Sequence, residues 1–80
     1  MEKFKNFLLH QNLSKNTIEA YVTSVTQFFK GFEELTKQNL LAFKAVLVDK
    51  HKGKTVNLRI QGVNKYLEFL NKPKLKLKYI

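Results

Sequence analysis

Apolar residues recur every three or four positions along this chain, in four stretches separated by helix-capping residues. The pattern is clearest after Ser14, whose hydroxyl can accept a hydrogen bond from the backbone N–H of Thr17. Leu13 and Ile18 flank this cap at the positions of a hydrophobic staple. One apolar stripe follows: Ile18, Tyr21, Val22, Val25, Phe28, Phe29 and Phe32. We therefore predict an amphipathic helix that starts at Ser14 and that Gly31 ends in a left-handed conformation.

Three further helices are predicted from the same signals. The first covers about residues 2–11, and the third is capped by Thr36 and ends near Gly53. The fourth runs from Thr55 to about Asn71. Because the connections are short, neighbouring helices should pack side by side. The expected fold is all-α, a compact four-helix bundle.

Two details of these helices bear on how they pack. In the third helix, Phe43 and Leu47 lie on one side and Leu41 and Val48 on another, so we expect it to be buried on more than one side. In the fourth helix, Gly62 lies in the interior, where glycine costs about 1 kcal/mol relative to alanine. We interpret Gly62 as a notch that lets another helix approach closely.

The pattern changes in residues 72–80, where basic and apolar residues alternate around and after Pro73. This alternation predicts an extended segment, either an edge strand or a linker. Alternate lysines on an extended chain lie about 6.6 Å apart, close to the spacing of neighbouring phosphates, while Leu75, Leu77 and Tyr79 could dock on protein. We therefore divide the chain into a helical domain, residues 1–71, and a basic linker, residues 72–80, leading to a further domain.

Composition narrows the class of protein. The 80 residues suffice for one small domain and contain no cysteine, so neither a disulfide framework nor a thiolate metal site is expected. No apolar run approaches the roughly 20 residues of a membrane span, and residues 1–3 do not open a signal peptide. We expect a cytoplasmic protein whose mature form starts at Met1. The net charge of +9 points to a polyanionic partner, first of all nucleic acid.

Catalytic and metal-binding patterns are absent. His10 and His51 are the only histidines, and no carboxylates stand at ligand spacing around them. The adjacent pair Glu33-Glu34 points in two directions on a helix, so it is not expected to share a proton. The triplet at residues 53–55 ends like a phosphate loop, but Val48 stands where the first glycine belongs. No metal and no cofactor are expected.

Polar residues form a strip on each of two predicted helices, opposite the apolar stripe. Small neutral strips of this kind suit a polyanion, and both helix N-termini present backbone N–H groups to phosphate. The alternative is that these are ordinary solvent-facing residues. The first strip is Asn16, Ala20, Thr23 and Gln27, and the second is Asn57, Gln61, Asn64 and Lys65, with Lys52, Lys54 and Arg59 around its start.

Two motifs carry a family resemblance. The first is Leu13-Ser14-x-x-Thr17-x-x-x-Tyr21-x-x-x-Val25-x-x-Phe28, and the second is Thr55-Val56-Asn57-x-x-Ile60-x-Gly62-Val63-x-x-Tyr66-Leu67-x-Phe69-Leu70. Together, and over residues 1 to about 72, the chain resembles the core-binding domain of phage integrases and tyrosine site-specific recombinases. The family often has glycine where this chain has Asn12, and alanine where it has Gly62.

The resemblance implies a SAM-like four-helix bundle that binds one side of a double-stranded DNA without catalysing any reaction. It implies as partners a catalytic domain of the same chain, which clamps the other side of the core site, and other recombinase protomers in a synaptic tetramer during integration or excision. The family's tyrosine nucleophile belongs to the catalytic domain. Tyr21, Tyr66 and Tyr79 are therefore not expected to be nucleophiles, and Tyr21 and Tyr66 fall on apolar arcs.

The predicted DNA contacts combine this implication with the polar strips and the basic tail. The resemblance implies contacts by the N-terminal parts of the second and fourth helices, at Ser14, Lys15, Asn16, Thr17, Thr23, Thr55, Asn57 and Arg59. The strips and the tail add Lys54, Gln61, Lys74 and Lys76.

Two other functions stay open. A small helical bundle could instead be a protein–protein interaction module whose basic tail binds an acidic partner. Peripheral membrane binding through the tail is the less favoured of the two, because the amphipathic faces are needed for the core.

Overall fold

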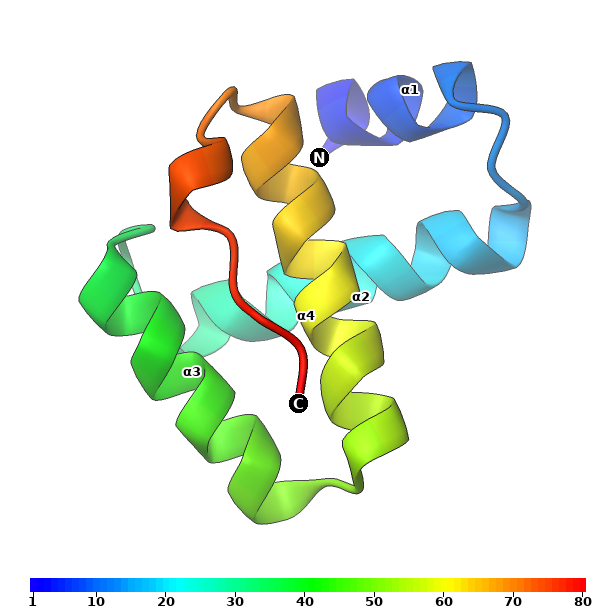
Figure 1. The fold of residues 1–80 in the computed structure, drawn as a ribbon. Coiled ribbons are helices and arrows are strands. Elements are labelled where there is room, and N and C mark those ends of the chain that lie inside the picture. Colours follow the sequence, from blue (N-terminus) through cyan, green and yellow to red (C-terminus); the bar gives the residue numbers. More distant parts are fainter.

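The computed structural model describes all 80 residues and contains helices but no strand. Its elements, in order, are α1 (Glu2–His10), α2 (Lys15–Gly31), α3 (Lys37–Lys50), α4 (Gly53–Phe69) and a short 3-10 turn, η1 (Pro73–Leu75). In Figure 1, α4 crosses in front of α2, α3 lies to one side, and the C-terminal segment runs between α3 and α4. The predicted all-α four-helix bundle is confirmed, with α4 starting two residues earlier than expected from Thr55.

Both predicted side-chain caps are present. The Ser14 hydroxyl accepts a hydrogen bond from the Thr17 backbone N–H at 3.2 Å, and the Thr36 hydroxyl accepts one from the Asn39 N–H at 3.1 Å. The predicted left-handed end at Gly31 is wrong, since no glycine has a positive φ. The chain instead leaves α2 extended at Phe32, with φ −140°, and this exit stacks the Phe32 ring on Phe28 in the core.

Asparagines, not glycines, occupy the left-handed positions. Asn12 has φ 61° after α1, and Asn71 has φ 60° after α4. At the end of α4, the Lys72 N–H donates to the Leu67 carbonyl at 2.8 Å, which is the hydrogen bond of a Schellman motif. This motif reverses the chain, so that the C-terminal segment returns along α4.

Two apolar clusters fill the interior. The larger one joins α2, α3, α4 and the C-terminal segment, and consists of Phe28, Leu40, Phe43, Leu47, Val56, Ile60, Val63, Leu67 and Leu77. The smaller one lies between α1, α2 and α4, and consists of Phe4, Leu8, Ile18, Tyr21 and Val25, with Tyr66 packed against it. Tyr21 and Tyr66 are therefore core and core-edge residues, as predicted.

Gly62 marks the closest approach of α4 to α2. A Cβ atom at this position would lie 2.6 Å from both Cβ and Oγ of Ser24 and 3.0 Å from Cα of Tyr21. Ser24 is fully buried, and its hydroxyl donates to the Ala20 carbonyl within α2 at 2.9 Å. The predicted packing notch is confirmed, and it fixes how the two longest helices cross.

The second apolar side of α3 is not buried. Leu41 is 50% exposed and Val48 49% exposed, so the prediction that α3 is covered on more than one side is wrong. The core that α3 faces, with Phe43 and Leu47, also contains α2, α4 and the C-terminal segment, and these elements all lie on the same side of α3, so that none covers its outer side.

The C-terminal segment is docked on the bundle. The prediction of an extended segment is wrong for residues 73–75, which form the 3-10 turn η1, because the fixed φ of Pro73 suits the first position of a helical turn. Residues 76–80 are extended and pair with no strand, so the edge-strand alternative is wrong as well. Leu77 is only 4% exposed and belongs to the larger cluster. Docking by an apolar residue of the tail, one of the two roles foreseen for it, is therefore confirmed at Leu77.

Candidate nucleic-acid interface

Positive charge on this domain is largely unpaired. Of 15 Lys and Arg residues, only Lys65 and Lys76 form an ion pair, and both pair with Glu68. The remaining thirteen have no carboxylate partner. A surface with this imbalance attracts polyanions over long distances.

The start of α2 presents one group of predicted contacts. The Ser14 hydroxyl caps the helix and donates a hydrogen bond to Thr17 Oγ1 at 2.9 Å, so both side chains have partners within the first turn. Lys15 and Asn16 are exposed beside them, and their side chains form no hydrogen bond within the chain. The backbone N–H groups of Lys15 and Asn16 precede the first hydrogen bond of the helix, and such groups can bind phosphate oxygens.

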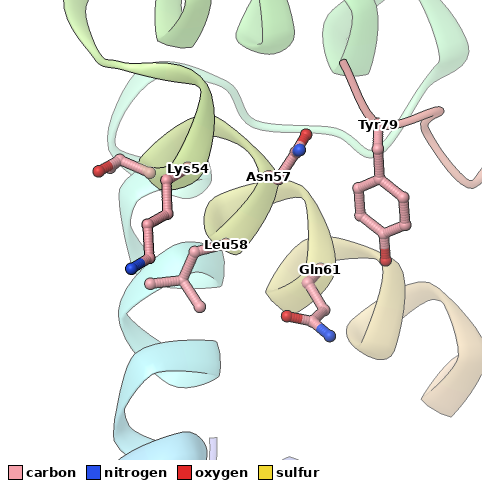
Figure 2. Close-up of a pocket in the computed structure, with 6 residues that line it drawn as sticks. Lys54, Asn57, Leu58, Gln61 and Tyr79 are labelled. Carbon is pink, nitrogen blue, oxygen red and sulfur yellow. The ribbon is translucent and has the colours of Figure 1, made fainter.

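The start of α4 lines a surface hollow of about 560 Å³ with a second group. Four predicted contacts border it: Lys54, Thr55, Asn57 and Gln61. Leu58 and Tyr79 complete the wall, and Figure 2 shows the Tyr79 ring beside the Gln61 side chain. The structure thus brings the tail to the predicted α4 contacts.

Thr23 lies apart from these residues. It borders a different hollow, of about 450 Å³, along the exposed face of α2 together with Val22, Thr26, Gln27 and Lys30. The structure therefore brings Lys54, Thr55, Asn57 and Gln61 together but does not bring Thr23 into the same hollow.

Arg59 is half-buried on α4 and is the only arginine of the chain. Its Nε atom is buried and has no hydrogen-bond partner, and no carboxylate pairs with the guanidinium. The charge of Arg59 is therefore not neutralised within the domain.

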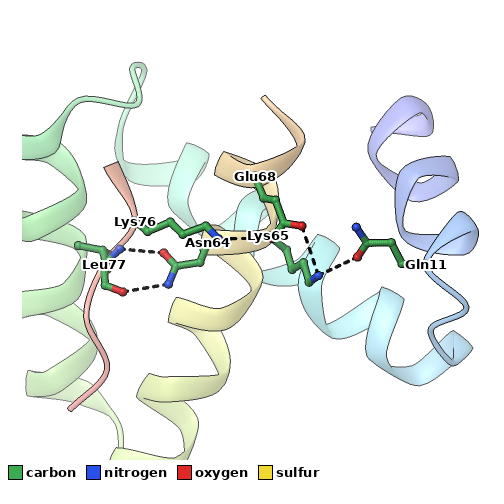
Figure 3. A network of polar contacts seen from close by, with 6 residues as sticks. All are labelled: Gln11, Asn64, Lys65, Glu68, Lys76 and Leu77. Atoms are coloured by element: carbon green, nitrogen blue, oxygen red, sulfur yellow. Dashed lines mark hydrogen bonds and ion pairs between the residues drawn. The ribbon is translucent and has the colours of Figure 1, made fainter. Parts of the chain in front are cut away.

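Asn57 and Asn64 bind the tail. The Asn64 side chain donates to the Leu77 carbonyl at 2.9 Å and accepts from the Leu77 N–H at 2.8 Å, as Figure 3 shows. Asn57 does the same with Ile80, at 3.2 and 2.9 Å. The Asn57 amide, one of the predicted DNA contacts, thus already forms two hydrogen bonds within the chain.

The tail lysines differ from one another. Lys74 is exposed in η1, whereas Lys76 Nζ lies 3.4 Å from a carboxylate oxygen of Glu68. Burial raises the pKa of Glu68, but the charges of Lys65 and Lys76 outweigh this and hold its pKa below the ordinary value. Glu68 therefore stays ionised at neutral pH, and Lys76 keeps its partner.

Two lysines of α3 also reach the tail, and sequence reasoning missed both. Lys37 Nζ donates to the Lys76 carbonyl at 3.4 Å, and Lys44 Nζ donates to the Lys78 carbonyl at 2.6 Å. Lys37 and Lys44 are seven residues apart, as are Asn57 and Asn64. This shared spacing on two neighbouring helices was the available signal, because it places each pair on one helix face.

Comparison with known proteins agrees with this geometry. The family model described as phage integrase, N-terminal SAM-like domain, matches residues 1–74. The chain belongs to this family. Membership implies for this SAM-like domain a DNA-binding role in recombination, and it confirms the resemblance seen in the two helical motifs.

One curated relative of this SAM-like domain is the "TnP I resolvase" of Bacillus thuringiensis. The two are 29% identical in an alignment of 79 positions that covers 86% of this chain and 28% of the relative. The chain thus spans less than a third of the length of that relative.

Asn12 occupies a position at which the family often has glycine. Its φ of 61° explains this preference, because glycine and asparagine tolerate the left-handed region better than other residues. In this SAM-like domain, Asn12 therefore adopts the left-handed conformation that the turn between α1 and α2 requires.

No helix of the SAM-like domain is both long and apolar enough to cross a membrane.

Proposed function

We propose that this domain binds double-stranded DNA through one face, formed by the N-terminal turns of α2 and α4 and the docked tail. In this proposal it grips the core recombination site without cleaving it. A catalytic domain of the same chain, reached through the tail, closes on the opposite side, and other protomers join in a synaptic tetramer. The setting is DNA integration or excision in the cytoplasm.

The observation that carries the proposal is the unpaired positive charge beside the predicted contacts. Lys15 at α2 and Lys54 at α4 have no carboxylate partner, and Arg59 has none either. Both helix starts add partial positive charge from their backbone N–H groups. The phosphates of a duplex would neutralise these charges, and counterions of the DNA would be released.

A non-catalytic role is supported by the burial of Tyr21. Tyr21 is 5% exposed, and burial together with the nearby Tyr79 raises its pKa above the ordinary value. A phenol that is buried and harder to ionise is a poor nucleophile. A single arginine also leaves too few guanidinium groups to assemble a phosphate-cleaving centre of the family's kind.

The experiment that tests this function is an amide chemical-shift titration of the labelled chain with a short duplex, at low and at near-physiological salt. We expect salt-sensitive shifts concentrated in residues 14–23 and 54–61 and in the tail. Shifts confined to the tail, or none, would contradict the proposed face.

The tail lysines should contribute charge but no sequence preference. Replacing Lys74, Lys76 and Lys78 with alanine should weaken binding to all duplexes alike. Because Lys76 is paired with Glu68, we expect about two lost phosphate contacts, and each should flatten the plot of log affinity against log salt by roughly 0.9. Replacing Lys3 and Lys5 on α1 should leave the slope unchanged, whereas an unchanged slope in the tail variant would rule out these contacts.

One observation favours a second function. Leu41 and Val48 form an exposed apolar side of α3, and a surface of this kind can bind another protein. If the domain is a protein-interaction module, this apolar side of α3 binds a partner protein, and the addition of DNA causes no chemical-shift change.

A further inference from the structure

The tail is held to α4 by its backbone at two points. Asn64 pairs with both backbone groups of Leu77, and Asn57 pairs with both backbone groups of Ile80. Seven residues of helix rise about 10.5 Å, and three residues of extended chain span about 10 Å. The two asparagines therefore match the repeat of an extended segment that runs antiparallel to α4.

The opposite side of the tail is held in the same manner. Lys37 and Lys44 of α3 donate to the carbonyls of residues 76 and 78. Of the tail side chains, only Leu77 is buried. The position of the segment is thus set by backbone contacts and one apolar side chain, and the side chains of Lys78 and Tyr79 remain available.

The docked tail places Tyr79 beside the start of α4, one of the two predicted DNA-binding helices. Tyr79 is 54% exposed and lines the same hollow as Lys54 and Gln61. Its own hydroxyl forms no hydrogen bond within the chain, so it can donate one to a ligand.

We infer that Tyr79 is a further DNA-contacting residue, whose hydroxyl donates a hydrogen bond to a backbone phosphate beside Lys54, and that Asn57 is a positioning residue that acts through it. This inference rests on the proposed function. In this inference Asn57 holds Ile80 in place, and Ile80 in turn keeps the neighbouring Tyr79 at the hollow. It also predicts that Tyr79 contributes equally on all duplex sequences, because a phosphate contact does not read bases.

Two single substitutions measure these roles in the 80-residue chain with a fluorescent duplex at low salt. Tyr79→Phe removes only the hydroxyl and should weaken binding about threefold to tenfold, the range of one net hydrogen bond. The salt slope should not change, because no charge is lost. Asn57→Ala should weaken binding by a similar factor and shift the Ile80 amide resonance. Asn6→Ala, which removes an exposed helical asparagine from α1, is the matched control and should bind normally.

A double-substitution cycle separates positioning from direct contact. In a Tyr79→Ala background, Asn57→Ala should have little further effect, because the contact that it positions is already gone. A full, additive loss would show that Asn57 touches DNA itself and would overturn the inference. Since both side chains lie outside the buried core, melting curves of the variants should stay close to the parent, which excludes unfolding as the cause.

The remaining outcomes are distinct from one another. If Tyr79→Phe and Asn57→Ala bind like the parent while the parent itself binds DNA, the proposed function holds and this inference fails. If the unchanged chain binds no duplex at low salt, the proposed function fails and the inference fails with it.

Discussion

Replacing Gly62 with alanine is expected to lower the free energy of unfolding by about 2 kcal/mol, the cost of forcing an extra methyl group into a packed core. The added Cβ would meet Ser24 Cβ and Oγ at 2.6 Å and Tyr21 Cα at 3.0 Å. These atoms belong to a helix backbone and to a buried side chain, so they cannot move aside cheaply. The gain in helix propensity, about 1 kcal/mol, offsets only part of the clash.

Urea denaturation of the variant and the parent measures this effect, with the midpoint expected to fall and the slope to stay constant. Gly31→Ala is the matched control, since nothing lies within 4 Å of a Cβ at that helical position. It should be neutral or stabilising by up to about 1 kcal/mol. Adding Ser24→Gly to Gly62→Ala should restore part of the loss, because it removes the closest atoms. A Gly62→Ala variant as stable as the parent would show that the helices can separate at little cost.

Reversing the charge of Lys15 and Arg59 together should reduce DNA affinity on the order of a hundredfold at low salt, through lost phosphate contacts and new repulsion. The two residues lie on α2 and α4, so the double variant tests whether both helices face the same duplex. Electrophoretic mobility shift or anisotropy with one short duplex is sufficient. An interaction with an acidic protein through the tail would persist in this variant, which separates the two functions.

The control for this prediction reverses Lys3 and Lys50, which changes the net charge by the same amount. Both are exposed and have no ion-pair partner, and neither is among the predicted contacts. This variant should lose far less affinity. An equal loss in both variants would mean that DNA responds only to the net charge and that no particular face of the bundle binds it. Because the Arg59 Nε is buried, the melting temperature of the variant with Lys15 and Arg59 reversed should also be measured, to show that it is still folded.

Local signals in the sequence were sufficient for most of the fold. Ser14 and Thr36 cap their helices because the hydroxyl and the N–H that it accepts from are only three residues apart. The apolar stripes indicate the core residues, because a period of 3.6 residues places them on one helix face whichever element packs against that face. Gly62 was identified as a notch because its cost within a helix needs compensation by packing. The charge imbalance, likewise, depends on composition alone.

Contacts between distant residues were decided by the tertiary structure. Leu41 and Val48 look like core residues by periodicity, yet they are exposed because no element covers that side of α3. The strip on α4 was predicted to face DNA, but two of its members, Asn57 and Asn64, hydrogen-bond the tail. That pairing joins residues 13 and 23 positions apart, through a chain reversal at Asn71, and the spacing of the two asparagines on α4 does not by itself specify the partner.

The sequence by itself thus determined the helices, most of their buried faces, the family and the positive charge, because each depends on spacing within a few residues or on composition. Only the tertiary structure decided which polar residues are still available to a ligand. An amide or ammonium on a helix surface can bind water, a neighbouring segment or DNA with similar chemistry, and the choice depends on what the fold brings within about 3 Å of it. For Asn57 the fold brought Ile80, and for Tyr79 it brought the hollow beside Lys54.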